Sequence, residues 1–198
     1  MKKEFSQRDF YTQKAKEQGY PARSVYKLGE IDEKFKLLQK GFFVLDLGCS
    51  PGSWILYISR KIGPIGRVFG ADTDKLRVKT PFNATFLQKD IFDVDFLENL
   101  KNFGKFDCVV SDLAPKVSGI RDVDAENSSL LCNRSLEICQ QVLKQGGNFV
   151  CKVLESPQTA DFIKQVKSNF VSVKPFKPKA SVKFSKEFFV VALKYGKE

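Results

Sequence analysis

The stretch from Phe42 to Trp54, FFVLDLGCSPGSW, constrains the fold of this chain more than any other part of the sequence. The apolar run at residues 43–47 predicts a buried strand, because it is short and bounded by turn residues. Gly48 and Gly52 allow a tight turn after it, and the proline between them opposes an early helical turn. The stretch therefore predicts a strand, a glycine-bounded loop and the start of a helix, which is the first unit of an open α/β sheet.

The loop reads DxGxxPG from Asp46 onward, and it lacks both the GxGxxG of nicotinamide sites and the GKS or GKT of phosphate loops. Without a lysine, and with an acid at the strand end, the loop is poorly suited to phosphates. It suits instead a cofactor with an amino group or hydroxyls and a net positive centre. It resembles motif I of the S-adenosylmethionine-dependent methyltransferases, although a plain turn between a strand and a helix can use the same glycines.

The composition fits one domain, residues 1–198, with a sizeable core, since 42% of the residues are hydrophobic and 19 are phenylalanine. The formal net charge of +10 favours a polyanion as the large partner. Histidine is absent, so proton transfer must use Lys, Asp, Glu, Tyr or Cys. No metal is expected either, because the usual metal ligand is missing.

The five cysteines form no CxxC pair and predict reduced core thiols of a cytosolic protein. The first residues, MKKEFSQRDFYTQK, contain acids and no apolar run, so they do not read as a signal peptide. No segment is long enough to cross a membrane. We therefore expect a cytoplasmic protein without a membrane partner.

Acidic residues end four successive predicted strands, at Asp46, Asp72, Asp90 and Asp112. Open α/β sheets bind ligands at the carboxyl ends of their strands, so four acids there predict a ligand site. Asp72 lies 24 residues after Gly48, near the distance at which such folds place an acid that binds ribose hydroxyls.

The N-terminal residues 1–27 carry seven Lys or Arg against three acids, with aromatic residues among them. This mixture suits RNA, whose phosphates meet the cations and whose bases stack on rings. The alternative is that the aromatic side chains pack on the domain. Apolar residues at helical spacing predict a helix over residues 23–36 that carries Lys27, so we expect residues 1–36 to form a basic helical extension.

The second half predicts helices over residues 122–144 and 157–170, separated by the strand NFVCKVL. Lys152 interrupts that apolar strand, so it either reaches the edge of the sheet or is held for chemistry. A last strand, EFFVVALKY, opens with Glu187. The segment of residues 167–186, which precedes this last strand, contains prolines but no acids. We expect it to be a loop that contacts a phosphate backbone. Its six lysines are Lys167, Lys174, Lys177, Lys179, Lys183 and Lys186.

From about residue 5, the chain resembles the FtsJ/RrmJ family of ribose 2′-O-methyltransferases, whose bacterial members modify 23S ribosomal RNA. The matching segments are ARSVYKLGEI, VLDLGCSPGSW, FLQKDIF, SDLAPKVSG, GGNFVCKV and SKEFFVVA, in order and with similar spacing. The resemblance implies a single-domain Rossmann-like α/β methyltransferase, with a mostly parallel seven-stranded sheet and helices on both faces. It further implies S-adenosylmethionine as cofactor, RNA as partner, most often of the large ribosomal subunit, and a monomer.

The resemblance also implies the site residues. The family's catalytic set falls on Lys27, Asp112, Lys152 and Glu187. Its cofactor residues fall on Gly52, Trp54, Asp72, Asp90 and Asp112, to which the loop adds Asp46 and Gly48.

The expected chemistry is direct transfer of the methyl group to a ribose 2′-hydroxyl, with Lys152 as the base that takes the hydroxyl proton. Lys152 can act only when neutral; burial, Lys27 and the cofactor's charge favour that form, whereas Asp112 and Glu187 oppose it. Asp112 is therefore expected to hold Lys152, and Glu187 to hold Lys27 or the ribose. Lys27 is expected to position the hydroxyl or a neighbouring phosphate. The alternative is that the four residues form only a structural double salt bridge.

Three other functions stay open at this point. One is the same chemistry on the anticodon loop of tRNA, and another is an RNA-binding assembly factor without turnover. The third is a nicotinamide-dependent oxidoreductase, which the absence of GxGxxG disfavours.

Overall fold

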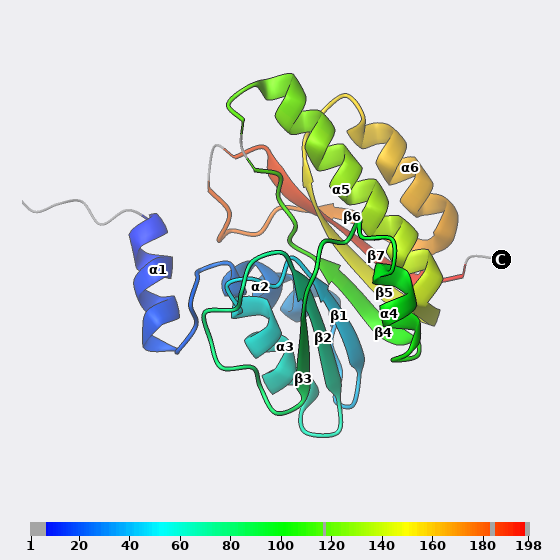
Figure 1. Cartoon of the computed structure of the whole chain (residues 1–198). Coiled ribbons are helices and arrows are strands. Elements are labelled where there is room, and N and C mark those ends of the chain that lie inside the picture. The colour runs from blue at the N-terminus through cyan, green and yellow to red at the C-terminus, as the bar shows by residue number, and fades with distance from the viewer. Residues whose placement is uncertain (1–6, 117, 183–184, 197–198) are drawn as a thin grey trace, which may run out of the picture.

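The computed structural model describes residues 7–116, 118–182 and 185–196, and one sheet of seven strands forms the centre of this part of the chain (Figure 1). The strands are β1 (Phe43–Leu47), β2 (Arg67–Asp72), β3 (Ala84–Gln88), β4 (Phe106–Ser111), β5 (Leu143–Leu154), β6 (Phe170–Phe176) and β7 (Glu187–Tyr195). Their order is β3-β2-β1-β4-β5-β7-β6, with β7 antiparallel to both neighbours and the other pairs parallel. The expected, mostly parallel sheet is confirmed.

The helices are α1 (Gln7–Glu17), α2 (Val25–Phe35), α3 (Ser53–Ile62), α4 (Phe96–Lys101), α5 (Arg121–Val142) and α6 (Thr159–Asn169). Helices α2 and α3 cover one face of the sheet, and α4, α5 and α6 cover the other (Figure 1). Each face has its own cluster of buried apolar side chains. The expected helices on both faces are therefore confirmed.

Helix α1 lies at one side of the molecule, next to the start of α2 (Figure 1). The Tyr11 ring centroid lies 5.2 Å from that of Tyr26, and the Arg60 guanidinium lies 4.6 Å from the Tyr20 ring centroid. Tyr11 and Tyr20 therefore pack on the domain, whereas Phe10 is 53% exposed. Phe5 lies outside the described residues.

The segment expected to be a lysine-rich loop, residues 167–186, begins instead with the end of α6 and continues as a strand. Residues 170–176 form β6, the outermost strand of the sheet, which pairs with β7. Lys174 and Pro175 obscured this strand in the sequence, yet an edge strand tolerates proline because one of its sides needs no hydrogen-bond donor. The loop proper begins at Lys177, and Lys183 lies outside the described residues.

Gly146 and Gly147, which follow the helix predicted over residues 122–144, lie in β5. Helix α5 ends at Val142, and Leu143 already pairs with Phe106 of β4. The pairing then shifts register, and Gly146 has a φ of 76°, which an L side chain rarely adopts. The glycine pair therefore serves an irregular start of β5.

The five cysteines are unpaired and buried, as expected for core thiols. Among the helices of the described ranges, none is both long enough and apolar enough to cross a membrane.

Candidate active site

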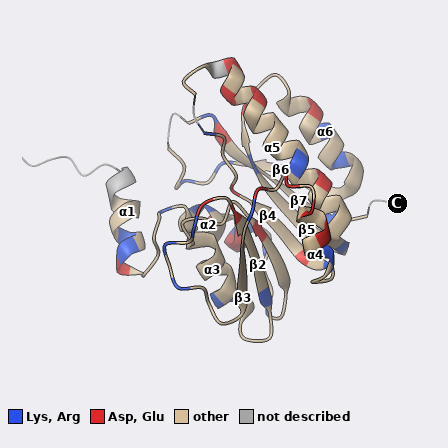
Figure 2. Cartoon of the chain, viewed as in Figure 1, with Lys and Arg blue, Asp and Glu red and all other residues tan. Residues whose placement is uncertain are grey.

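The four acids of the predicted strands gather at the carboxyl ends of the strands, along one side of the sheet. Asp72 is the last residue of β2, Asp112 directly follows β4, Asp46 is the fourth of five residues in β1, and Asp90 follows β3 by two residues. Acidic positions accordingly cluster where the central strands end (Figure 2). A cavity of about 600 Å³ opens there, and Gly48, Asp72, Asp90 and Asp112 are among its lining residues.

The glycines of the loop after β1 are required by its geometry. Gly48 and Gly52 have φ angles of 78° and 116°, in the region that favours glycine. A Cβ at Gly52 would lie 2.4 Å from Val78 Cγ2, and one at Gly48 would lie 3.0 Å from the Leu113 side chain. The loop therefore passes close to two other segments, and Gly48 presents its backbone to the cavity.

Asp72 holds this loop in place. Its Oδ2 accepts the main-chain N–H of Ser50 at 2.9 Å, and its Oδ1 accepts that of Asp74 at 2.8 Å. The side chain lines the cavity, and each carboxylate oxygen keeps capacity for a further donor. Asp72 thus shapes the cavity wall in addition to the ligand contact expected from the sequence.

Asp46 is buried, and neither of its carboxylate oxygens has a hydrogen-bond partner among the described residues. Burial, reinforced by the nearby charges of Asp112 and Asp72, raises the pKa of Asp46 well above its usual range. A buried carboxyl group without a donor costs stability. Such a group, two residues before Gly48, is suited to a ligand that brings a donor or a positive charge, but Asp46 itself is fully buried and does not line the cavity.

Trp54 does not line the cavity. Its side chain is buried between α3 and α2, and the indole N–H donates to the main-chain oxygen of Ser24 at 2.9 Å. Its ring centroid lies 5.9 Å from that of Phe189 on β7. The side chain supports the start of α2, and Gly52 is likewise absent from the cavity lining.

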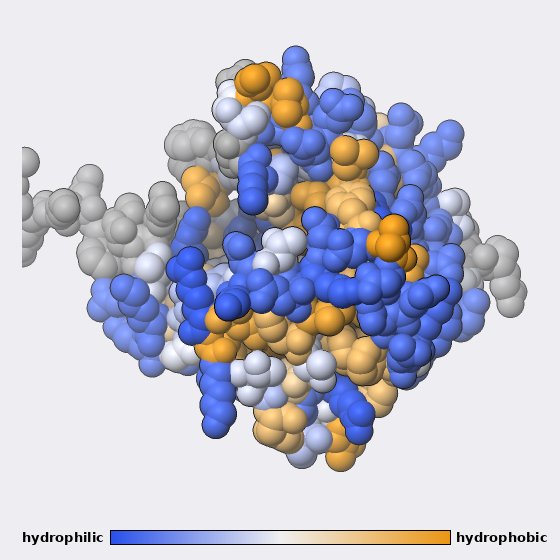
Figure 3. Space-filling view, in the orientation of Figure 1, coloured by the Kyte–Doolittle hydropathy of each residue, from blue (hydrophilic) through white to orange (hydrophobic). Residues whose placement is uncertain are grey.

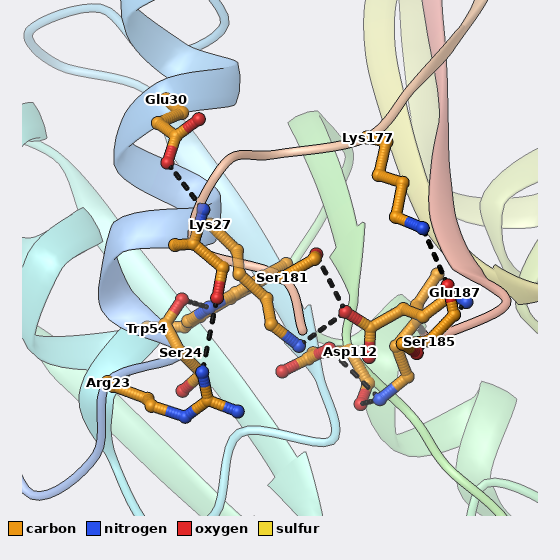
Figure 4. Close-up of polar contacts among 12 residues, drawn as sticks. Arg23, Ser24, Lys27, Glu30, Trp54, Asp112, Lys177, Ser181, Ser185 and Glu187 are labelled. Carbon is orange, nitrogen blue, oxygen red and sulfur yellow. Dashed lines mark hydrogen bonds and ion pairs between the residues drawn. The ribbon is translucent and has the colours of Figure 1, made fainter. Parts of the chain in front are cut away.

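The expected catalytic set comes together as two ion pairs at the same edge. Lys27 Nζ lies 2.6 Å from Glu187 Oε1. Lys152 Nζ lies 3.0 Å from Asp112 Oδ1 and donates a hydrogen bond to the Asp112 main-chain oxygen at 2.5 Å. We call these four residues the charged tetrad; Lys27 and Glu187 point toward each other with Asp112 beside them (Figure 4).

Strand alternation explains how the tetrad forms. Val110 and Val150 face α2 and α3 in the core, so Asp112 and Lys152, each two residues further on, face the same side. Lys152 pairs with Phe189 of β7, which places Glu187 on that side as well. The buried apolar residues of β4, β5 and β7 that face α2 are therefore followed, at this end of the strands, by the charged residues of the tetrad.

The tetrad is largely buried and close to neutral. Between 9% and 16% of each side chain is exposed, and two cations face two carboxylates. Burial opposes ionisation of Glu187, but Lys27, Lys152 and a 3.0 Å hydrogen bond from Ser181 outweigh it and hold the pKa of Glu187 below its usual value. Nothing in the sequence pointed to Ser181, because its contact depends on the path of the β6–β7 loop.

Glu187→Gln should lower the melting temperature at pH 7 by several degrees, since a lost hydrogen bond to a charged group costs about 1.5–3 kcal/mol. Because the pKa of Glu187 is lowered on folding, its ionised form stabilises the folded chain at pH values above the ordinary pKa of 4.5. That stabilisation disappears as the pH falls through the lowered pKa. Thermal unfolding from about pH 7 to about pH 3 should therefore show the difference closing in acid.

The exposed Glu155 offers a matched control, because Glu155→Gln removes the same charge outside the tetrad. That variant should melt with the native chain at both ends of the pH range. A difference for Glu187→Gln that does not depend on pH would contradict the ionised pair.

The described ranges contain no group of three or more His, Cys, Asp or Glu placed to hold a metal ion.

Comparison with known proteins gives one consistent family. A family model described as FtsJ-like methyltransferase matches residues 20–195. The chain is 46% identical over 188 residues to the protein of Oleidesulfovibrio alaskensis named Ribosomal RNA large subunit methyltransferase E, covering 94% of this chain and 91% of that one. A protein of the same name from Bdellovibrio bacteriovorus is 43% identical over 192 residues, covering 96% and 97%.

The structure agrees with this assignment. A solved structure of a Plasmodium falciparum protein, assigned as a ribosomal RNA methyltransferase, matches with a TM-score of 0.79 at 28% identity. The match covers 90% of this chain and 100% of that one. The chain therefore belongs to the FtsJ-like methyltransferase family.

Proposed function

We propose that this chain transfers a methyl group from S-adenosylmethionine to a ribose 2′-hydroxyl of large-subunit ribosomal RNA. The observation that carries the proposal is the charged tetrad, which stands beside a cavity bounded by the glycine loop and the strand-end acids. The names of the relatives support large-subunit ribosomal RNA as the substrate.

The residues present fit the cofactor. The unpartnered carboxyl group of Asp46 and the backbone of Gly48 suit an amino group and a positive centre, and Asp72 and Asp90 offer carboxylate oxygens to hydroxyls. Lysine is missing from the loop itself, so nothing there favours a phosphate. When bound, S-adenosylmethionine supplies a methyl group on a sulfonium, which is already a good electrophile.

The tetrad supplies alignment and proton transfer. A free hydroxyl is a weak nucleophile, so its proton should pass to Lys152 as the new bond forms, which requires that the Lys152 ammonium has first released its own proton to water. Asp112 fixes that amine through two contacts, at 3.0 and 2.5 Å. Lys27 and Glu187, on the opposite side of the tetrad, are placed to hold the ribose or a neighbouring phosphate. Holding the hydroxyl in line supplies a large part of the rate enhancement.

A groove along α2 supports RNA as the partner, although none of the four residues of the charged tetrad lines it. It measures about 910 Å³, and its walls include five lysines against three acids, together with the aromatic rings of Tyr11, Tyr26 and Phe176. The lysines are Lys14, Lys34, Lys36, Lys61 and Lys179. Hydrophilic side chains also cross the middle of the face shown in Figure 3. Cations beside rings suit single-stranded RNA, whose phosphates and bases are both accessible.

RNA binding should therefore weaken steeply with salt. Each phosphate contact of a single strand contributes about −0.7 to the slope of log K against log salt concentration, so a Lys34→Ala, Lys36→Ala double variant should bind less tightly and show a slope smaller in magnitude by about 1.4. Fluorescence anisotropy with a labelled RNA fragment between about 50 and about 200 mM KCl measures both. Binding that stays constant across this range would contradict the proposed surface.

Methylation assays test the proposed reaction. Purified large-subunit particles, free ribosomal RNA and tRNA are offered in turn with labelled S-adenosylmethionine, and ribose methyls are mapped by mass spectrometry. We expect transfer to large-subunit RNA and none to a substrate whose target ribose is 2′-deoxy. Transfer to tRNA alone would replace the proposed substrate, and transfer to no RNA would refute the proposal.

A further inference from the structure

Two charged side chains anchor the loop between β6 and β7 to the α2 region. The Glu30 carboxylate accepts the main-chain N–H of Lys179 at 2.7 Å with one oxygen and that of Ala180 at 2.9 Å with the other. Arg23, just before α2, donates to the main-chain oxygen of Ala180 at 3.2 Å. One short piece of the loop is therefore held by both its donors and its acceptor.

The anchored piece leads directly into the charged tetrad. Ser181, the next residue, donates to Glu187 Oε1 at 3.0 Å, and the same oxygen receives the Lys27 ammonium at 2.6 Å. Lys27 stands three residues before Glu30 on α2, so both lie on the same side of the helix. The contacts form a closed ring from α2 through the loop and β7 back to α2.

The ring is buried where the loop turns. Ala180 is 1% exposed and Ser181 is 5% exposed, although the neighbouring Lys179 side chain is exposed. A carboxylate that accepts two main-chain N–H groups makes strong, charge-assisted hydrogen bonds. Glu30 is therefore used to fix the path of the loop.

We infer that Glu30 is a positioning residue for methyl transfer: it fixes residues 179–181 so that Ser181 and Glu187 hold the Lys27 ammonium in place. This inference rests on the proposed function, because Lys27 and Glu187 are the ribose side of that site. Glu30 acts through the loop and does not touch the reacting atoms.

Limited proteolysis tests directly whether Glu30 holds the main chain of residues 179 and 180 in place. Trypsin cleaves after lysine but not before proline, so Lys174 and Lys177 are protected by the prolines that follow them, and the Lys179–Ala180 bond is the susceptible one in the anchored piece. Glu30→Ala should speed cleavage of that bond at least about tenfold, because local opening exposes it. Glu30→Gln, which keeps one acceptor oxygen, should be intermediate. The matched control is Glu33→Ala, which removes an exposed acid from the same helix and should change nothing.

Kinetics then separate positioning from mere anchoring. At saturating RNA and cofactor, Glu30→Ala should lower kcat about tenfold, while the dissociation constant of S-adenosylmethionine stays within about twofold, because Glu30 does not line the cofactor cavity. A structural role alone would lower the melting temperature and leave kcat of the folded chain unchanged. Accelerated cleavage with an unchanged kcat, or unchanged cleavage, would overturn the inference.

A readout without activity distinguishes this inference from the proposed function. Glu187→Gln should lower the melting temperature at pH 7 by less than half as much in the Glu30→Ala background as in the native chain, because the pair is no longer held. Equal effects in both backgrounds would refute positioning even in an active enzyme. Unequal effects in a chain that methylates no RNA would support positioning and refute the proposed reaction.

Discussion

Lys152→Ala should give a folded chain that binds S-adenosylmethionine and transfers methyl groups about 100- to 10,000-fold more slowly, which is the range that a general base contributes. The chain contains no histidine that could replace Lys152 as the base. Asp112 borders the cavity and its side chain is 16% exposed, although its Oδ1 is buried, so the loss of the ion pair should lower the melting temperature without unfolding the chain. Single-turnover transfer to RNA, cofactor titration and thermal unfolding measure the three properties.

Lys152→Arg separates the catalytic role from the structural double salt bridge. Arginine keeps a positive charge for Asp112 but does not lose its proton in proteins, so it cannot accept one from the ribose hydroxyl. If the tetrad were only structural, Lys152→Arg would be nearly as active as the native chain and Lys152→Ala would be unfolded. We expect both variants to be folded and inactive. A folded Lys152→Ala variant with normal turnover would refute the assignment of Lys152.

The tetrad could be predicted because the resemblance to a known family implies all four residues, and three of them also interrupt simple patterns. Lys152 breaks an apolar strand, Asp112 ends another, and Glu187 opens a third, so strand alternation alone places them on one side of the sheet edge. Lys27 was predicted from the resemblance alone. Asp112 was expected to hold Lys152, and Glu187 to hold Lys27 or the ribose; the structure contains the ion pairs Lys152–Asp112 and Lys27–Glu187. Their catalytic roles remain predictions that the variants above test.

Other parts of the site depend on contacts that no local pattern reveals. Glu30 and Ala180 are 150 residues apart, and their contact follows from the loop that β6 and β7 create. The strand β6 was itself hidden by Lys174 and Pro175, which are typical of a loop but tolerated at a sheet edge. The resemblance implied Trp54 as a cofactor residue, and the structure shows that its side chain is buried in the core, where no local pattern placed it.

Asp46→Asn should stabilise the chain at neutral pH and weaken cofactor binding at the same time. In the folded chain the buried carboxyl group keeps a proton that the unfolded chain releases at neutral pH, and an isosteric amide avoids this cost of protonation, so the melting temperature should rise by a few degrees. If the same group receives a donor or positive charge from S-adenosylmethionine, its loss should raise the dissociation constant about 10- to 100-fold. Calorimetric titration and thermal unfolding measure these two effects on the same samples.

The pH dependence of the stability gain identifies its cause. Below the ordinary pKa of 3.8 the carboxyl group is protonated in both the folded and unfolded chain, so the native chain and Asp46→Asn should melt alike. As the pH rises, the unfolded chain releases the proton while the raised pKa of Asp46 retains it in the folded chain, so the native chain loses stability relative to the variant.

The exposed Asp161 on α6 serves as the control, and Asp161→Asn should show no such divergence. An Asp46→Asn variant that melts with the native chain at about pH 8 and binds the cofactor normally would show that Asp46 neither costs stability nor serves the ligand. The combination expected here, a more stable protein with a defective site, arises because a buried group left unsatisfied by the fold is available to the cofactor.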